Sequence, residues 1–333
     1  MTEASAWRTD LWAAADLVTP MAIRVAATLR LADSIAAGTT TAEALAAAVD
    51  ADPDALARLM AHLVSAGVLV RTGADGFGLA PLGEALRDDD PAGMRAWLDL
   101  EGAIGRADLC FVDLLHTVRT GEPAFPRRFG RPYWEDLSGN PGLAASFDAL
   151  MGARLLADAP VVAAAYPWGD LGSVVDVGGG DGTLLLALLS AHADLRGTVV
   201  DLAGPVTRAR AAIAASGLGD RADAEAGSFF DVLPAGAGGY VLSGVLHDWD
   251  DEPARRILQR CADAAGRTGR VLVVDHFGGP PDTEGDLRML AYVNGRERTL
   301  DDLGALAETA GLRLGSRTPA GTRTVMELLP RTS

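Results

Sequence analysis

The chain has 333 residues, of which 49% are hydrophobic and 22% charged, and its formal net charge is −16 at pH 7. This composition is typical of a globular protein with a real core, and the acidic balance argues against nucleic acid or anionic membrane surfaces as partners. All of its basic residues are arginines, which excludes Schiff-base lysine chemistry.

The N-terminus carries acidic residues and no basic region ahead of an apolar core, and no apolar segment approaches the roughly 20 residues that span a bilayer. We therefore expect a cytoplasmic protein. Cys110 and Cys261 lie far apart and lack metal-ligand spacing, so we expect two buried thiols, no disulfide and no metal.

Residues 39–86 predict a short capped helix, a turn at 50–53, a second amphipathic helix and a small hairpin around GADG. This is the pattern of a winged helix-turn-helix. The second helix, from Asp54 to Ala66, offers only one arginine and one histidine, and the segment is net acidic. A packing and dimerisation module is therefore favoured over a DNA-binding one.

Residues 92–165 contain helical stretches with bulky side chains, interrupted by the loop GEPAFPRRFGRP. Such side chains commonly fill a helical core, and some could instead form the roof of a pocket. The candidates for a pocket roof include Trp97, Phe147 and Met151.

From Ser173 onward, apolar strands alternate with amphipathic helices, beginning with SVVDVG and TLLLALLSAH. This alternation predicts a doubly wound, Rossmann-like α/β domain with a parallel sheet, whose ligand site lies at the carboxyl ends of the strands. We expect three regions: residues 1–100 (winged-helix dimerisation domain), 101–165 (helical linker and pocket roof) and 166–333 (Rossmann-like domain).

The stretch VVDVGGGDG predicts a strand, a tight turn and the start of a helix, with glycines at 178, 180 and 182. Asp176 and Asp181 flank the turn, and no arginine or lysine occurs between Arg154 and Arg196. Two carboxylates would repel a pyrophosphate, whereas they suit a positively charged cofactor such as S-adenosylmethionine.

Asp201 ends the next strand, TVVDL, where a carboxylate can accept hydrogen bonds from the hydroxyls of a ribose. The alternative for Asp201 is a cap for the following helix. For Asp176 the alternative is a strand-end residue that binds local backbone N–H groups, a role compatible with ligand binding.

The segment HDWDDEPARRIL follows another buried strand. Asp250, Asp251 and Glu252 are best explained as capping residues of a helix that begins near Pro253, and a metal site built from them is disfavoured. His247 has no such explanation, because it lies at the carboxyl end of a central strand. We expect it to be catalytic, whereas His62, His116, His192 and His276 have no comparable setting.

Several motifs in this order, VVDVGGGDG, VVDLAGP, AGSFFDVLP, LSGVLHDWDDEPARRIL, VLVVDHF and DLRMLAYVNGRERTLDDLGALAETAGL, closely resemble the class I small-molecule O-methyltransferases that use S-adenosylmethionine. The resemblance is to the branch shared by plant phenolic and bacterial polyketide and naphthoate enzymes, and it covers nearly the whole chain. It implies that the winged-helix segment forms a homodimer and that S-adenosylhomocysteine is the second product.

The resemblance also implies residue roles. His247 matches the general base, and Asp275 and Glu297 match the residues that orient it. The expected cofactor contacts are Arg154, Asp176, Gly178, Gly180, Asp201, Leu202, Ser228, Phe229 and Ser243, with Arg154 on the cofactor carboxylate. The expected substrate contacts are Trp97, Phe147, Met151, Asp248, Met289 and Asn294.

The sequence departs from the family pattern at several positions. Gly227-Ser228 stands where many members have Gly-Asp, so a hydroxyl replaces the carboxylate expected at adenine. Ser243-Gly244 replaces the Lys-Trp of plant members, and Asn294 stands where glycine is common. None of these changes removes a proposed reacting group.

The sequence predicts methyl transfer to a phenolic hydroxyl of a small aromatic natural product. With an ordinary pKa near 6.5, His247 is expected to be mostly neutral at working pH. Three alternatives stay open: decarboxylation or hydroxylation with the same cofactor, a ligand-sensing DNA-binding regulator, and a nicotinamide-dependent oxidoreductase. Arg8 and Arg24 could meet a substrate carboxylate, although surface or interface pairing is favoured for both.

Overall fold

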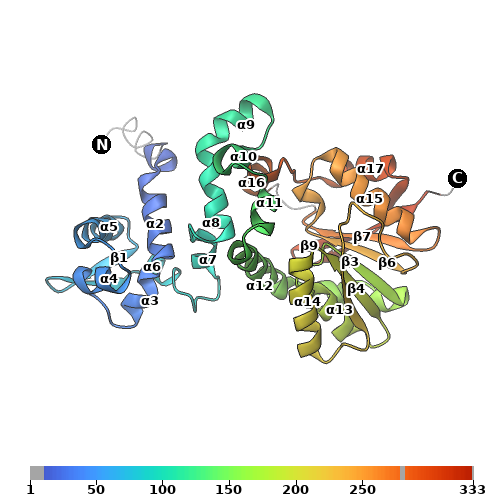
Figure 1. Cartoon of the computed structure of the whole chain (residues 1–333), viewed down its shortest axis with the longest axis horizontal. Coiled ribbons are helices and arrows are strands. Elements are labelled where there is room, and N and C mark those ends of the chain that lie inside the picture. The colour runs from blue at the N-terminus through green and yellow to red at the C-terminus, as the bar shows by residue number, and fades with distance from the viewer. Residues whose placement is uncertain (1–10, 278–281, 332–333) are drawn as a thin grey trace. The chain divides into compact units, whose positions relative to one another are not determined.

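The computed structural model describes residues 11–277 and 282–331. These fall into two compact units, residues 1–108 and 109–333, which are described separately (Figure 1). The segment 109–165, which the sequence assigned to the helical linker and pocket roof of residues 101–165, lies in the second unit with the sheet.

The first unit is helical with one small hairpin. Its helices are α2 (Val18–Thr28), α3 (Leu31–Ala36), α4 (Ala42–Ala48), α5 (Pro53–Ser65), α6 (Pro81–Glu84), α7 (Met94–Leu98) and α8 (Ala103–Asp108), and its strands are β1 (Leu69–Thr72) and β2 (Gly76–Leu79). The core of this unit consists of leucines, alanines, Met60 and Phe77.

The winged-helix pattern of residues 39–86 is confirmed. Thr41 and Asp52 cap α4 and α5 by accepting hydrogen bonds from backbone amides, and Pro53 opens α5. The antiparallel pairing of Thr72 with Gly76 closes the hairpin over the GADG turn. The Nε2 atom of His62 and the hydroxyl of Thr19 form a hydrogen bond of 3.0 Å, which gives His62 a structural role.

The second unit begins with helices that precede a seven-stranded sheet. These are η1 (Leu109–Asp113), α9 (Leu114–Thr120), α10 (Ala124–Phe129), α11 (Tyr133–Ser138), α12 (Pro141–Ala165) and η2 (Trp168–Leu171). Among the described residues, no helix has the combination of length and apolar character that crossing a bilayer requires.

The strand order of the sheet is β5-β4-β3-β6-β7-β9-β8. The strands are β3 (Ser173–Val177), β4 (Arg196–Asp201), β5 (Ala222–Ala226), β6 (Gly239–Ser243), β7 (Arg270–Asp275), β8 (Leu312–Ala320) and β9 (Arg323–Pro330). The helices between them are α13 (Thr183–Ala191), α14 (Ala203–Ser216), η3 (Leu246–Asp248), α15 (Asp251–Ala265), α16 (Thr283–Val293) and α17 (Leu300–Thr309).

The first five strands are parallel, as expected for a Rossmann-like fold, but the last two are not. β9 pairs antiparallel with β7, and β8 pairs antiparallel with β9. The turn between β8 and β9 is too short for a crossover helix, so these two strands must be antiparallel. The expectation of a wholly parallel sheet is wrong at this edge.

Helices cover both faces of the sheet (Figure 1). On one face, leucines of α13 and small residues of α12 and α14 pack on strand residues such as Val174 and Val199. On the other face, Ile257 and Leu258 of α15 and Leu303 of α17 pack on strand residues such as Tyr240. Cys110 and Cys261 are both buried, as expected.

Candidate active site

The glycine turn joins β3 to α13 at the carboxyl edge of the sheet. Gly178, Gly180 and Gly182 have φ angles of 73°, 60° and 82°, which favour glycine. A Cβ atom on Gly178 would lie 2.9 Å from Val245 and 3.5 Å from the ring of Phe229. The turn is therefore a backbone cradle with little room for any side chain at its first position.

Asp176 is buried directly beneath this turn. It is 1% exposed, and neither carboxylate oxygen has a hydrogen-bond partner among the residues that the structure describes. Burial, and then the nearby charges of Asp201 and Asp181, raise the pKa of Asp176 to about 7. A buried carboxylate without donors is stabilised by a ligand that supplies positive charge or hydrogen bonds.

Asp201 ends β4 and faces the same turn. It accepts hydrogen bonds from the backbone amides of Gly180 at 2.8 Å and Leu202 at 2.6 Å. Leu202, not Asp201, occupies the N-cap position of α14, so the helix-capping alternative is wrong. Burial raises the pKa of Asp201 although these two backbone amides lower it.

Asp181 is the third aspartate at the glycine turn, and among the described residues it accepts hydrogen bonds only from Thr183. With no cation in the described part of the chain to neutralise them, the three aspartates form a negatively charged site. The charge and the unsatisfied carboxylate of Asp176 fit the cationic cofactor S-adenosylmethionine, and Asp201 retains acceptor capacity for a ribose. The Ser243 hydroxyl, at the end of β6, is also buried without a partner among the described residues.

The remaining expected cofactor contacts are placed as follows. Phe229 lies against Gly178 and makes edge contacts with Phe230 and Trp249. The Ser228 hydroxyl accepts a hydrogen bond from the Phe230 amide at 3.2 Å. Leu202 is 50% exposed. Arg154 is exposed on α12, and the structure by itself assigns it no contact.

His247 lies on η3, at the carboxyl end of β6, within a group of carboxylates. Its Nδ1 atom is 3.3 Å from Glu297 and 3.7 Å from Asp275, and its Nε2 atom is 3.5 Å from Asp248. Asp275 ends β7, and Glu297 lies between α16 and α17. The structure thus brings together the three residues to which the sequence assigned catalytic roles.

The protonation of His247 differs from the expectation. Burial lowers the pKa of His247, but Asp275, Asp248 and Glu297 together outweigh burial and raise this pKa to about 10. The imidazole is therefore protonated at neutral pH in the cofactor-free protein, whereas the sequence predicted a neutral ring. Burial raises the pKa of Asp248 to about 6, against the lowering effect of His247.

The ligand atoms of His247, Asp275 and Glu297 lie within 4.8 Å of one another, close enough to contact one cation. A metal ion would have to displace the proton that these carboxylates favour on the imidazole. Transfer of a methyl group from a sulfonium also needs no metal. This arrangement therefore favours a proton-holding role over a metal site.

The other residues of HDWDDE act as the sequence indicated. Asp250 is the N-cap of α15, and Asp251 and Glu252 lie in its first turn, so the helix begins two residues before Pro253. The remaining described histidines of the second unit have other partners. His116 lies near Glu122, His192 near the carbonyl of Ala163, and His276 near the carbonyl of Thr322.

The expected substrate contacts fall on several elements. Phe147 and Met151 lie one turn apart on α12, Met289 lies on α16, Asn294 ends α16 with a φ of 60°, and Asp248 lies beside His247. Asparagine tolerates this left-handed conformation better than most residues, which explains its presence where glycine is common. Trp97 lies on α7 of the first unit.

Of the two arginines considered for a substrate carboxylate, Arg24 forms an ion pair with Asp108, in agreement with the favoured pairing role. Arg8 lies outside the described residues.

Two groups near the expected site residues were not assigned to the site from the sequence, namely the pair Tyr133 and Tyr292, and Arg298. Tyr133 stacks on Tyr292 with ring centroids 5.7 Å apart, and Trp134 makes an edge contact at 5.6 Å with Phe147, an expected substrate contact. The aromatic pair at 133–134 was the available signal. Arg298, whose side chain is almost fully buried behind His247, had no signal in the linear sequence.

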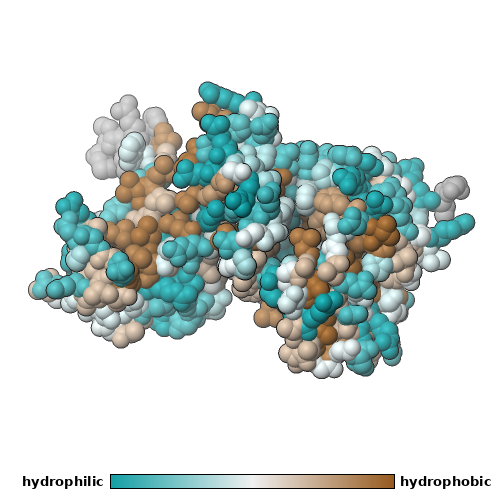
Figure 2. All heavy atoms as spheres, viewed as in Figure 1, coloured by the Kyte–Doolittle hydropathy of each residue, from teal (hydrophilic) through white to brown (hydrophobic). Residues whose placement is uncertain are grey.

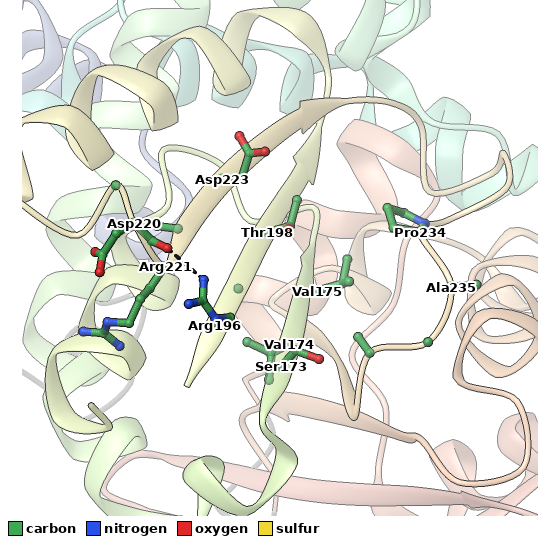
Figure 3. A pocket seen from close by; sticks show the side chains of 15 residues that line it. Ser173, Val174, Val175, Arg196, Thr198, Asp220, Arg221, Asp223, Pro234 and Ala235 are labelled. Carbon is green, nitrogen blue, oxygen red and sulfur yellow. Dashed lines mark hydrogen bonds between the residues drawn. The ribbon is translucent and has the colours of Figure 1, made fainter. Parts of the chain in front are cut away.

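A groove of about 600 Å³ lies at the opposite edge of the sheet, along the first residues of β3, β4 and β5 (Figure 3). Figure 3 shows Val175, Thr198 and Asp223 beside one another on these strands, with Arg196 close to Asp220. None of the expected site residues lines this groove. It is therefore separate from the candidate active site.

Comparisons with known proteins agree with this geometry. Residues 111–313 match the model of the O-methyltransferase domain, and residues 12–89 match the O-methyltransferase dimerisation domain. The chain is 54% identical over 320 residues to the 2,7-dihydroxy-5-methyl-1-naphthoate 7-O-methyltransferase of Streptomyces carzinostaticus, covering 96% of both chains. It is 48% identical to the aclacinomycin 10-hydroxylase RdmB of Streptomyces purpurascens, covering 93% of this chain and 85% of the hydroxylase.

A solved structure of an O-methyltransferase from neocarzinostatin biosynthesis, in complex with S-adenosyl-L-homocysteine and 1,4-dihydroxy-2-naphthoic acid, is also similar. It has a TM-score of 0.94 and 54% identity, covering 96% of this chain and 98% of that one. The Rossmann-like fold and the match to the O-methyltransferase domain identify the chain as a class I methyltransferase. The chain belongs to the family of O-methyltransferases that use S-adenosylmethionine and carry an N-terminal dimerisation domain.

Proposed function

We propose that this enzyme methylates a phenolic hydroxyl of a small aromatic acid of the naphthoate type, with His247 as the proton acceptor. The observation that carries the proposal is the His247 imidazole, which lies at the carboxyl edge of the sheet with carboxylates near both ring nitrogens. The 54% identical relative is a naphthoate 7-O-methyltransferase, which supports the class of substrate.

The chain's own residues perform binding, orientation and proton transfer. When bound, S-adenosylmethionine supplies an electrophilic methyl group, which bonds to the phenolic oxygen as the carbon–sulfur bond breaks. Asp176, Asp201 and the glycine turn would hold the cofactor, and in a molecule whose His247 ring is neutral the phenolic proton would pass to Nε2 of His247. Glu297 and Asp275, on the Nδ1 side, stabilise the imidazolium that results.

The raised pKa of His247 determines how the acceptor reacts. A phenol has an ordinary pKa of about 10, and the pKa of His247 is also about 10. Because a ring with this pKa is already protonated at neutral pH, a phenol that binds beside it must release its own proton to solvent. The resulting pair of phenolate and His247 imidazolium is the same pair that forms when a neutral ring takes the phenolic proton. In either case the acceptor of the methyl group is a phenolate paired with the His247 imidazolium.

The enzyme is further proposed to act as a homodimer in the cytoplasm. The match of residues 12–89 to a dimerisation domain supports the dimer. The net charge of −16 supports the absence of nucleic acid and membrane partners.

The proposal is tested with candidate hydroxynaphthoic acids and S-adenosylmethionine. We expect a product heavier by one CH₂ group together with S-adenosylhomocysteine. His247→Ala should lower kcat by about two to four orders of magnitude while cofactor affinity, measured by calorimetry, changes little. His192→Ala, a histidine outside the site, is the control. Full activity of His247→Ala would remove the proposed base.

The mass of the product also distinguishes methyl transfer from a second candidate function. A relative 48% identical to this chain is a 10-hydroxylase, so hydroxylation of an aromatic polyketide is the alternative. A product heavier by one oxygen atom, formed without consumption of S-adenosylmethionine, would show that the enzyme is a hydroxylase and not a methyltransferase.

A further inference from the structure

Arg298 is a buried cation with three hydrogen-bond acceptors. Its side chain is 5% exposed. One terminal nitrogen donates to the carbonyl of Leu246 at 2.6 Å, and the other donates to the carbonyl of Trp249 at 2.9 Å and to Asp251 at 2.8 Å. The contact with Arg298 is the largest cause of the lowered pKa of Asp251. The guanidinium therefore links three points on one short stretch of chain.

That stretch carries His247 and has weak hydrogen bonds of its own. η3 is a single turn, and the amides of Asp248 and Trp249 donate to Val245 and Leu246 at 3.3 Å each. These distances are long for backbone hydrogen bonds, whose usual value is about 2.9–3.0 Å. The carbonyls directly before His247 and directly after Asp248 are the two that Arg298 holds. The loop is therefore held mainly by hydrogen bonds from Arg298 and not by hydrogen bonds within the loop.

The segment that contains Arg298 also supplies Glu297. The amide of Arg296 donates to the carbonyl of His247 at 2.8 Å. A Cβ atom on Gly295 would lie 2.2 Å from that same carbonyl, so only glycine allows this approach. One short segment therefore binds the loop at three carbonyls and places Glu297 3.3 Å from Nδ1 of His247.

We propose that Arg298 is the positioning residue for His247. Its planar guanidinium binds the two carbonyls on either side of the His247–Asp248 pair and so holds the imidazole with Nδ1 toward Glu297. Lysine could not replace it, because an ammonium group lacks the flat fork that reaches several acceptors in fixed directions. This inference rests on the proposed role of His247 as proton acceptor.

The first test compares Arg298→Gln with Arg255→Gln. Arg255 also donates two hydrogen bonds to an acid in the first turn of α15, Glu252, but among the described residues it makes no hydrogen bond to the loop that carries His247. We expect Arg298→Gln to lower kcat by about 10- to 100-fold, since small misplacements of a reacting group cost up to about 100-fold. The KM for cofactor should change less than threefold, and Arg255→Gln should match the wild type.

The second readout is the titration of His247 by NMR in histidine-labelled, cofactor-free protein, with the signal assigned from His247→Gln. The titratable groups that face the ring are Asp248, Asp275 and Glu297. The other charged or titratable residues that line the small cavity beside it are His276, Arg296 and Arg298. If the loop relaxes, the carboxylates recede from the ring. The midpoint in Arg298→Gln should therefore move to lower pH by at least one unit.

A loss of activity without a change in the His247 midpoint would overturn the proposal. General destabilisation would lower activity without moving the carboxylates relative to the His247 ring. An unchanged kcat would also overturn it. Should Arg298→Gln fail to fold, Arg298→Lys tests the same point, with an expected kcat between wild type and His247→Ala. The NMR titration does not depend on catalysis, so it tests Arg298 even if His247→Ala is fully active and the proposed function fails.

Discussion

At the scale of single residues, the site depends on carboxylates whose surroundings differ. Asp176 is buried without hydrogen-bond partners among the described residues, whereas Asp201 accepts from two backbone amides. Asp176 is the last but one residue of β3 and Asp201 is the last residue of β4, and the sequence predicts cofactor contacts for both. Only the packing around them shows that Asp176 is the destabilised group, with a pKa raised to about 7.

Asp176→Asn should stabilise the cofactor-free protein at pH 8 and not at pH 4. The folded protein keeps the proton on Asp176 up to about pH 7, while the unfolded chain loses it near the model value of 3.8. The contribution of Asp176 to the free energy of unfolding therefore falls as pH rises between these values and stays low above them. Each pKa unit corresponds to about 1.4 kcal/mol, so a gain of up to a few kcal/mol is expected.

Urea unfolding of both proteins at the two pH values measures this change. Asp223→Asn, at an exposed position on β5, is the control. Cofactor affinity of Asp176→Asn should fall about 10- to 100-fold, since losing a hydrogen bond to a charged group costs about 1.5–3 kcal/mol. Equal stability at pH 8 would show that Asp176 is ionised at no cost in the free protein.

At the scale of elements, the β3–α13 turn is the proposed binding site of the cofactor. Its first glycine, Gly178, has a positive φ and faces Val245 and Phe229. Gly217, which ends α14, has a nearly equal φ of 74° but nothing within 4 Å of its Cβ position. Alanine at Gly217 therefore measures the destabilisation caused by backbone strain alone, whereas alanine at Gly178 adds the destabilisation caused by steric contact.

Gly178→Ala should destabilise the protein more than Gly217→Ala. Both variants bear the strain of an L-residue at positive φ, roughly 1–2 kcal/mol, and only Gly178→Ala must also displace Val245. Cofactor affinity should fall in Gly178→Ala and remain at the wild-type value in Gly217→Ala. Thermal unfolding and calorimetry measure both effects. Similar unfolding temperatures for the two variants would mean that Val245 moves aside freely.

Other elements show where sequence patterns are weak. β5, with the sequence ADAEA, has few β-formers and lies at the edge of the sheet, so its residues gave no strand signal. The antiparallel β8–β9 pair also escaped the prediction of a parallel sheet. The winged-helix elements, by contrast, have local capping and turn signals and were predicted almost to the residue.

At the scale of the whole molecule, apolar side chains remain exposed on the first unit. Leu11, Trp12, Leu17 and Val18 are 62–78% exposed, and Figure 2 shows hydrophobic atoms on the visible face of this unit. Exposed groups of apolar side chains commonly mark interaction sites. Three of these residues lie within the matched dimerisation domain.

We expect the wild-type protein to sediment with twice the mass of the chain. The double variant Trp12→Glu, Leu17→Glu should sediment as a monomer, because it places charges in the contact between copies. The control is Leu82→Glu, at an exposed position on α6 in the hairpin region. A monomeric wild type at micromolar concentration would contradict the homodimer.

The sequence by itself determined the Rossmann-like class, the winged helix, the acidic glycine turn and the position of His247 after a strand, because these depend on local periodicity and on the edge where parallel strands end. The protonation of His247 and Asp176 and the placement of Arg298 depended on the tertiary structure. A pKa reflects burial and charges that arrive from distant segments, such as Asp275 and Glu297 beside His247. Such neighbours are created only when the chain folds.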